Sequence, residues 1–231
     1  FTCFAPLAQH YGVLALDHRG HGQGIRSRAA FRLEDCADDA MAACDALGLQ
    51  HVIPVGYSMG GAVASLVWKQ HRVRVPGLVL AATAPFFHHT RQERLGFLSL
   101  GGLAALARIT PVQSREWLTE RFYLQRKRDQ WEAWAVEEAS RHDWRMVLEA
   151  GRAIGGFDAR PWMTEIDVPT SVIVTMRDSV VPLHRQVRWF KAIPGAEALR
   201  VDGDHDAVIA LASQFVPTLV RAIESVLTRA G

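Results

Sequence analysis

Short apolar runs alternate with amphipathic segments over the first third of the chain and again over its last quarter. Five apolar runs have the length and composition of buried strands: 13–16, 52–55, 78–82, 170–175 and 198–201. Helical spacing of apolar residues predicts helices at about 33–47, ended by Gly48, and at about 183–191 and 207–228. Strands that are apolar on both faces and alternate with helices indicate an α/β fold, in which helices cover both faces of a mostly parallel sheet.

A long helical stretch interrupts this alternation. From about Pro85 to Asp167 the pattern is helical throughout and rich in tryptophan. An insertion between two strands of one sheet is expected to dock over the carboxyl edge of the sheet, where parallel sheets carry their ligand crevice. We therefore expect three segments: the first part of an α/β core at 1–84, a helical cap at 85–167, and the second part of the core at 168–231.

The pentapeptide Gly56-Tyr57-Ser58-Met59-Gly60 is the strongest chemical signal in the chain. It lies between the apolar run 52–55 and a helix-like stretch at 62–68. A serine between a strand and a helix must turn sharply, and small residues two positions before and after it tolerate the close approach. The turn lifts the Ser58 hydroxyl out of the sheet and aims the backbone N–H of Met59 at an oxyanion beside it. We interpret the pentapeptide as a nucleophile elbow; the alternative is a tight glycine turn with a bystander serine.

A serine hydroxyl becomes nucleophilic when an imidazole takes its proton and a carboxylate orients that imidazole. His205 is the one histidine of ten that follows the last predicted strand, and Asp178 comes directly after the strand predicted at 170–175. The alternatives are an exposed loop histidine and an aspartate that caps a turn. Asp202, Asp204 and Asp206 are too close to His205 in sequence to orient its ring. We predict Ser58, Asp178 and His205 as a catalytic triad.

Four segments of the chain together resemble the α/β-hydrolase superfamily, in particular its serine esterases and lipases with a helical cap. They are the elbow, the loop Asp17-His18-Arg19-Gly20-His21-Gly22, Asp178 with Val181-Pro182, and Gly203-Asp204-His205-Asp206. The resemblance implies that the loop at 17–22 supports the site without doing chemistry, and that no cofactor is needed. A serine nucleophile separates the chain from relatives that attack with aspartate.

One feature of that superfamily is missing from the chain. Relatives carry an earlier strand that ends in a His-Gly loop, whose backbone N–H is the second oxyanion donor, whereas Phe1 already falls in the helix after that loop. Met59 is then the only donor that the sequence offers. We expect the chain to be a fragment that lacks its N-terminal strands, with the second donor in the missing segment.

Composition and charge limit the kinds of partner and location that we expect for the chain. The formal net charge is +2, which favours neither a nucleic-acid surface nor a polybasic membrane anchor. No run approaches the ~18 apolar residues of a membrane-spanning helix, so we expect no stable membrane insertion and a cytoplasmic location. The three cysteines lack a paired spacing and are expected to be reduced, and Asp202, Asp204 and Asp206 lack the rest of a calcium loop, so no metal is expected.

These features together predict a serine hydrolase that cleaves a carboxylic ester of a hydrophobic small molecule or lipid through an acyl-enzyme. Tyr57 and Trp134 are the candidate substrate-binding residues. The alternatives on the same triad are an acyltransferase, a C–C hydrolase and a haloperoxidase-like enzyme, and outside catalysis a ligand-binding member of the fold. The stretch 95–103 is either a helix that meets lipid or a cap helix packed inward. The oligomeric state is left open.

Overall fold

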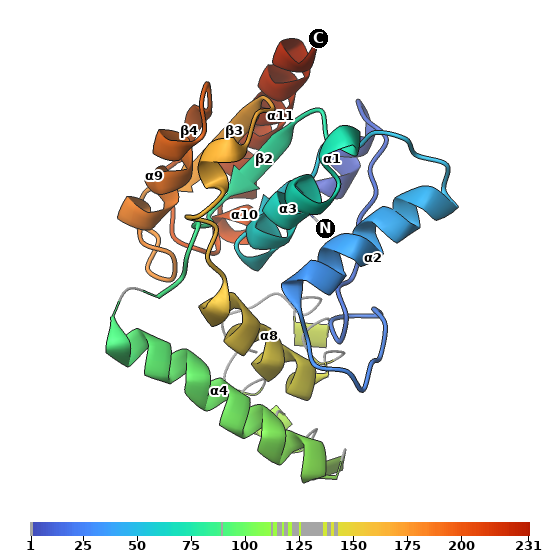
Figure 1. Cartoon of the computed structure of the whole chain (residues 1–231), viewed down its shortest axis with the longest axis vertical. Coiled ribbons are helices and arrows are strands. Elements are labelled where there is room, and N and C mark those ends of the chain that lie inside the picture. Colours follow the sequence, from blue (N-terminus) through green and yellow to red (C-terminus); the bar gives the residue numbers. More distant parts are fainter. Residues whose placement is uncertain are drawn as a thin grey trace. The chain divides into compact units, whose positions relative to one another are not determined.

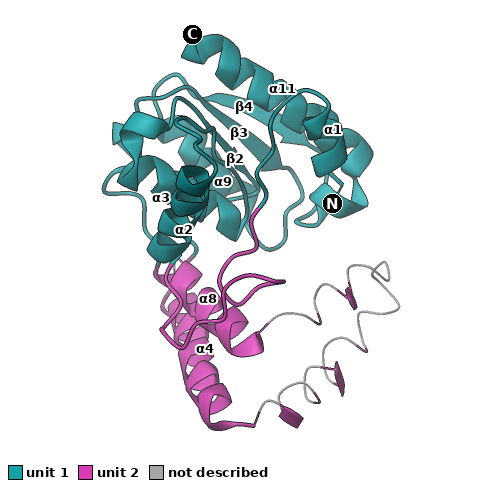
Figure 2. Ribbon diagram, turned by 90° about the vertical axis from the view of Figure 1, so that its right-hand side faces the viewer, with its two compact units in different colours: residues 1–15, 33–87, 157–231 teal, residues 16–32, 88–156 magenta. Residues whose placement is uncertain are grey.

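The computed structural model describes residues 2–88, 90–111, 113–114, 117, 120–121, 125, 136–137, 140 and 143–231. The chain forms two compact units, each built from segments that are distant in sequence (Figure 2). Unit 1 contains residues 1–15, 33–87 and 157–231, and unit 2 contains residues 16–32 and 88–156. The domain boundaries predicted at 84/85 and 167/168 stay a prediction.

Unit 1 is built on a parallel four-stranded sheet in the order β1-β2-β3-β4 (Figure 1). The strands are β1 (Val55–Tyr57), β2 (Leu78–Ala81), β3 (Thr170–Thr175) and β4 (Glu197–Val201). Every residue of β2 and β3 is buried, as the apolar runs in their sequences predict for central strands. The predicted α/β class with a mostly parallel sheet is confirmed.

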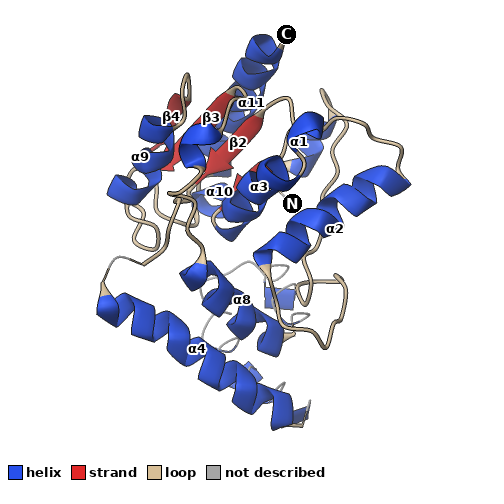
Figure 3. Ribbon diagram, viewed as in Figure 1, coloured by secondary structure: helices blue, strands red, loops and turns tan. Residues whose placement is uncertain are grey.

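Helices cover both faces of this sheet (Figure 3). On one face, α1 (Phe4–Ala8) and α11 (Ala212–Ala230) pack against the sheet through a cluster that includes Leu7, Ile173 and Phe215. On the other face lie α3 (Met59–Gln70) and α9 (Leu183–Ala192), with α2 (Leu33–Ala46) packed against α3. Alternate residues of each strand point to opposite faces, so strands that are apolar throughout serve both layers.

Most helices and strands of unit 1 have bounds close to the predicted ones, but two are shifted or divided. The run at 52–55 forms β1 later than predicted, at Val55–Tyr57. The last helix is divided into α10 (Ala207–Ala210) and α11, because Leu211 has φ −124° and ψ 38° and so leaves the helical region. The short 3₁₀ helices η1 (Arg72–Arg74) and η3 (Met163–Glu165) complete the unit.

The strand predicted at 13–16 is wrong. Residues 12–18 have no regular structure, and none of the backbone hydrogen bonds of the described residues joins 13–16 to the sheet. Val13, Leu14 and Leu16 are each about two-fifths exposed. An apolar run becomes a strand only when a neighbouring strand accepts its hydrogen bonds, and in the part of the chain described here β1 pairs only with β2.

Unit 2 joins two helices to the loop at 16–32. The helices are α4 (Arg91–Ile109), which begins at a Thr90–Glu93 capping box, and α8 (Trp144–Gly156). The two helices pack closely: a Cβ on Gly155 would lie 2.2 Å from the Phe97 ring. The outer face of α4 exposes leucines, among them Leu95 and Leu106. The candidate substrate-binding Trp134 and the neighbouring Trp131 lie outside the described residues.

The three cysteines and Trp162 are buried. Cys3, Cys36 and Cys44 are all buried and free. Trp162 belongs to unit 1, where its ring stacks on Trp68 at 6.1 Å between centroids. Among the described residues, no helix combines the length and apolar character that crossing a bilayer requires.

Candidate active site

Ser58 is the single residue between β1 and α3, at the point predicted for the elbow. Its backbone has φ 54° and ψ −120°, a conformation that residues with a Cβ rarely adopt. The Ser58 N–H donates to the carbonyl of Ala81 at the end of β2, 2.9 Å away. The strand-to-helix turn is therefore held in a strained conformation by the neighbouring strand.

The glycines around Ser58 have unequal roles. A Cβ on Gly56 would lie 2.1 Å from the carbonyl oxygen of Gly60, and a Cβ on Gly61 would lie 2.4 Å from the Thr83 side chain. A Cβ on Gly60 would meet nothing within 4 Å. The expectation that both glycines of the pentapeptide are required by close approach holds for Gly56 and is wrong for Gly60. Gly61, outside the pentapeptide, is the second glycine that packing demands.

The structure brings Ser58, Asp178 and His205 into one hydrogen-bonded chain. His205 Nε2 lies 2.8 Å from Ser58 Oγ, and His205 Nδ1 lies 2.9 Å from Asp178 Oδ2. When Nδ1 carries the proton and donates it to the carboxylate, Nε2 is free to accept a hydrogen bond from the serine hydroxyl. The remaining histidines whose ring contacts are described bind elsewhere, as His71 does at Asp38 and His88 at Gly155.

The parallel sheet explains why these three residues meet. Tyr57 pairs with Ala81, and Ala81 pairs with Ile173, so β1, β2 and β3 end at one edge. Thr175 pairs with Val201, so the loops that carry Asp178 and His205 leave neighbouring strand ends. In an open parallel sheet, loops at the carboxyl ends of the strands converge on one rim, which is where such folds place their ligands.

Asp178 lies in a turn that is built to hold a charged carboxylate. Its side chain is fully buried, and its oxygens accept hydrogen bonds from the N–H groups of Val180 and Val181 and from the Thr175 hydroxyl. Burial by itself raises the pKa of Asp178, but the hydrogen bonds from His205, Thr175 and Val181 outweigh it, and the pKa lies below its usual value. The carboxylate is therefore ionised and able to orient the imidazole.

Thr175 and Gln186 support this turn, and the sequence pattern did not single them out. Gln186, on α9, is completely buried. Its side-chain oxygen accepts from the Thr175 N–H at 3.0 Å, and its amide donates to the Val181 carbonyl at 2.6 Å and to Asp178 Oδ2 at 3.2 Å. A glutamine on the polar stretch 183–191 gives no local sign of burial. The closest signal is its position one helical turn after Pro182, beside the turn that carries the carboxylate.

Two further predicted groups can be placed relative to Ser58. Met59 is the first residue of α3, and the first N–H groups of a helix have no partner within it, so the Met59 N–H lies at a helix N-terminus suited to binding negative charge. The Tyr57 hydroxyl donates to the carbonyl of His205 at 2.7 Å, and the Tyr57 ring packs edge-on against Phe215. Burial, followed by the nearby Asp178 charge, raises the pKa of Tyr57, so this side chain is a neutral donor.

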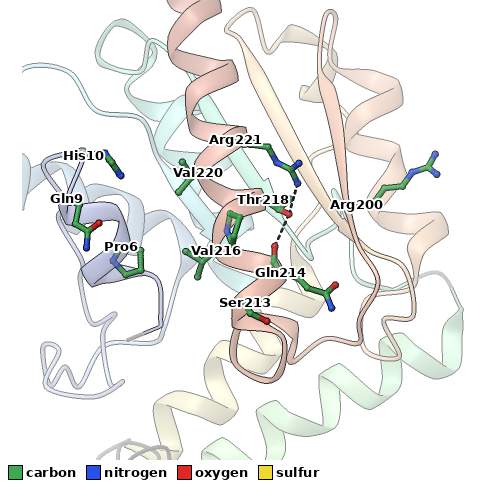
Figure 4. Close-up of a pocket in the computed structure, with 11 residues that line it drawn as sticks. Pro6, Gln9, His10, Arg200, Ser213, Gln214, Val216, Thr218, Val220 and Arg221 are labelled. Atoms are coloured by element: carbon green, nitrogen blue, oxygen red, sulfur yellow. Dashed lines mark hydrogen bonds between the residues drawn. The ribbon is translucent and has the colours of Figure 1, made fainter.

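A cavity of about 600 Å³ lies beside α11 (Figure 4). Pro6 of α1 and Gln9, directly after that helix, line it on one side, and Val216 and Val220 of α11 also line it. None of the three triad residues borders this cavity. Among the described residues, no group of three or more His, Cys, Asp or Glu side chains is arranged to hold a metal ion.

The family model described as the alpha/beta hydrolase fold matches residues 1–210, which is most of the chain. The chain belongs to the α/β-hydrolase family. A putative carbamate hydrolase, RutD of Caulobacter segnis, is 24% identical over an alignment that covers 94% of this α/β hydrolase and 83% of the relative. The proline iminopeptidase PfmaB of Pestalotiopsis fici is 37% identical over only 91 residues, which cover 38% of this chain and 32% of that protein.

Solved structures give the same result for the fold. The enol-lactonase from Burkholderia xenovorans LB400 superposes with a TM-score of 0.74 over 96% of this α/β hydrolase and 85% of the lactonase, at 23% sequence identity. At that identity the likeness extends to the fold alone. Because the family model and the relatives agree, the chain is a hydrolase by family, and the bond that it cleaves is a separate question.

Proposed function

We propose that this α/β hydrolase cleaves a carboxylic ester of a hydrophobic small molecule through a covalent acyl-enzyme. One observation supports this proposal above all: His205 lies within hydrogen-bonding distance of both the Ser58 hydroxyl and the buried Asp178 carboxylate. A serine on a strained turn, with its base and the base's orienting group in line, is the arrangement that nucleophilic catalysis requires.

The first half of the proposed reaction acylates the serine. Ser58 Oγ attacks the ester carbonyl carbon while its proton passes to His205 Nε2, and the imidazolium that results is stabilised by Asp178. The Met59 N–H binds the oxyanion of the tetrahedral intermediate. The intermediate collapses when the bond to the leaving oxygen breaks, and that oxygen takes the proton from Nε2 and departs as an alcohol.

The second half returns the enzyme to its starting state. Water loses a proton to His205 Nε2 and attacks the acyl carbon, and the second tetrahedral intermediate expels Ser58 Oγ, which recovers the proton. The products are the free acid and the unmodified serine. No step needs a group other than substrate, water and the residues named.

The proposal of an ester draws on the relatives as well as on the site. The names of the relatives include a putative carbamate hydrolase and an enol-lactonase, and both describe attack on an acyl carbon bonded to oxygen or nitrogen. An acyltransferase, a C–C hydrolase, a haloperoxidase-like enzyme and a silent ligand-binding protein are the competing assignments. The acyltransferase would pass the acyl group to a second alcohol, the C–C hydrolase would break a carbon–carbon bond, and the haloperoxidase-like enzyme would use the same triad.

A fluorophosphonate probe followed by an ester panel tests the proposal. We expect the probe to label Ser58 and the label to be lost in Ser58→Ala and His205→Ala. Ser213→Ala and His10→Ala, which change residues that line a cavity without any triad residue, should keep the label. We expect p-nitrophenyl esters to be hydrolysed with a preference for apolar acyl chains. Wild-type protein that neither labels nor releases nitrophenol from any ester would leave the ligand-binding protein as the surviving assignment.

A further inference from the structure

The main chain of His205 is held at both of its polar groups by side chains outside the triad. Its carbonyl accepts from the Tyr57 hydroxyl at 2.7 Å, and its N–H donates to Asp204 Oδ1 at 2.6 Å. Backbone groups in a loop normally bond to water or to other backbone. The two hydrogen bonds from side chains therefore fix the peptide groups on both sides of the His205 Cα.

Tyr57 links the histidine loop to the strand that carries the nucleophile. It is the last residue of β1 and the immediate neighbour of Ser58. Its ring lies between the His205 ring, 5.7 Å away, and Phe215 of α11, 5.4 Å away. Tyr57 is partly buried and packs against the core cluster that contains the buried Phe215, so its ring is held in place while its hydroxyl reaches the His205 carbonyl.

Asp204 links the same loop to the turn that carries Asp178. Besides the His205 N–H, its Oδ1 accepts from the Ser179 N–H at 2.7 Å and from the Ser179 hydroxyl at 2.9 Å. Ser179 is the residue directly after Asp178. One carboxylate oxygen therefore receives three hydrogen bonds and joins the two loops.

These bonds form a second chain of contacts that runs beside the triad, from Tyr57 through the His205 main chain and Asp204 to Ser179. Tyr57, Ser179 and Asp204 are sequence neighbours of Ser58, Asp178 and His205, and they connect the same three chain segments through backbone groups. We propose that Tyr57 and Asp204 are positioning residues that set where the His205 imidazole lies between Ser58 and Asp178. This inference rests on the proposed hydrolase function, and it assigns to Tyr57 a part different from direct substrate binding.

The chemistry explains why such fixing is needed. The imidazole takes a proton from the serine and then gives it to a leaving oxygen, so it has to serve two positions without losing the carboxylate. Displacement of a reacting group by about 1 Å can cost roughly a hundredfold in rate. The loop at 202–206 lies at the surface, with Asp202 and Asp204 exposed, and needs anchors beyond its own packing.

Tyr57→Phe tests the carbonyl anchor, with Tyr11→Phe as the matched control. The substitution removes one hydroxyl and keeps the ring against Phe215. We expect kcat for a p-nitrophenyl ester and the rate of fluorophosphonate labelling to fall about fivefold to tenfold, the value of one hydrogen bond, with KM changed less than twofold. Tyr11 also packs against the core cluster but is not a sequence neighbour of any triad residue, so Tyr11→Phe should leave both rates unchanged.

Asp204→Ala and Asp204→Asn test the N–H anchor. Alanine removes the shared acceptor, and we expect a loss of kcat about as large as that of Tyr57→Phe. Asparagine keeps a carbonyl oxygen at the position of Oδ1, so it should restore most of the rate. Asp202→Ala is the control, because Asp202 lies in the same loop and its carboxylate pairs with Arg177, 3.0 Å away, where both side chains are exposed.

The outcomes separate this inference from the function on which it rests. A wild-type protein that the probe does not label overturns the proposed function. Labelling of the wild type with unchanged kcat in Tyr57→Phe and Asp204→Ala overturns the positioning roles and leaves the function intact. A rise in KM at constant kcat in Tyr57→Phe would also overturn them, because it would assign the hydroxyl to substrate binding.

Discussion

At the scale of single residues, the site depends on conformations that few side chains tolerate. Ser58 has a positive φ, and the backbone at Gly56 lies so close to the Gly60 carbonyl that a side chain would not fit between them. Such strain persists only where the surroundings fix it, and here the Ser58 N–H is bonded to the neighbouring strand. Packing therefore requires Gly56 as much as the chemistry requires Ser58.

Alanine substitutions at the glycines test this view. Gly56→Ala should lower the free energy of unfolding by about 1–3 kcal/mol or prevent folding, because the added Cβ meets backbone that cannot move aside. Gly60→Ala should be neutral or stabilising by up to about 1 kcal/mol, since Gly60 lies in the helix α3 with open space around it. Urea unfolding of both variants measures the difference, and equal destabilisation would contradict the close-approach argument.

At the scale of elements, the Asp178 carboxylate is supported by the helix α9 as well as by its own turn. The turn after β3 is fixed by Gln186 from α9, whose buried amide bonds to Thr175, Val181 and Asp178. A buried polar side chain that satisfies several backbone groups is costly to remove, because its partners stay buried and lose their bonds.

Gln186→Leu should therefore affect stability and activity together. We expect the free energy of unfolding to fall by about 1–3 kcal/mol, because the Thr175 N–H and the Val181 carbonyl lose their partner. We also expect kcat to fall as the Asp178 turn loosens. Gln214→Leu on the exposed side of α11 is the control and should stay within about 0.5 kcal/mol of wild type. A Gln186→Leu variant as stable and active as its control would show that the Asp178 turn keeps its conformation without Gln186.

At the scale of the whole molecule, the chain is divided into two units that each combine distant segments. In unit 2 the loop at 16–32 is joined to α8 and α4 through Glu149, whose side chain is 8% exposed. Glu149 accepts from the Phe31 N–H at 2.8 Å and pairs with Arg145 and Arg108 at 3.1 and 2.8 Å. Gly20, with φ 72°, lies so close to Met146 that a Cβ there would be 2.1 Å from that side chain.

Glu149→Gln tests this linkage. The substitution removes the closer of two carboxylates from the buried Arg145 and leaves only Asp143, 3.6 Å away, so we expect unit 2 to lose about 3 kcal/mol of stability. Hydrogen exchange of the Phe31 amide should accelerate by roughly a hundredfold or more, the equivalent of that loss. Glu165→Gln, which breaks an exposed pair with Arg72, is the matched control and should cost less than about 1 kcal/mol. Unchanged exchange at Phe31 would mean that Glu149 does not hold the loop.

The sequence by itself determined the parallel α/β class, most strand and helix positions, and three side chains at strand ends. Local patterns carry this information, because apolar periodicity reports burial and a loop after a strand in a parallel sheet must leave at a common edge. Only the tertiary structure decided which contacts hold that edge together. The lack of a strand at 13–16, the open space at Gly60, the burial of Gln186 and the anchors on His205 all depend on partners distant in sequence. No local pattern contains that information, because a hydrogen bond or a steric contact depends on two residues, and the second one is distant in the sequence.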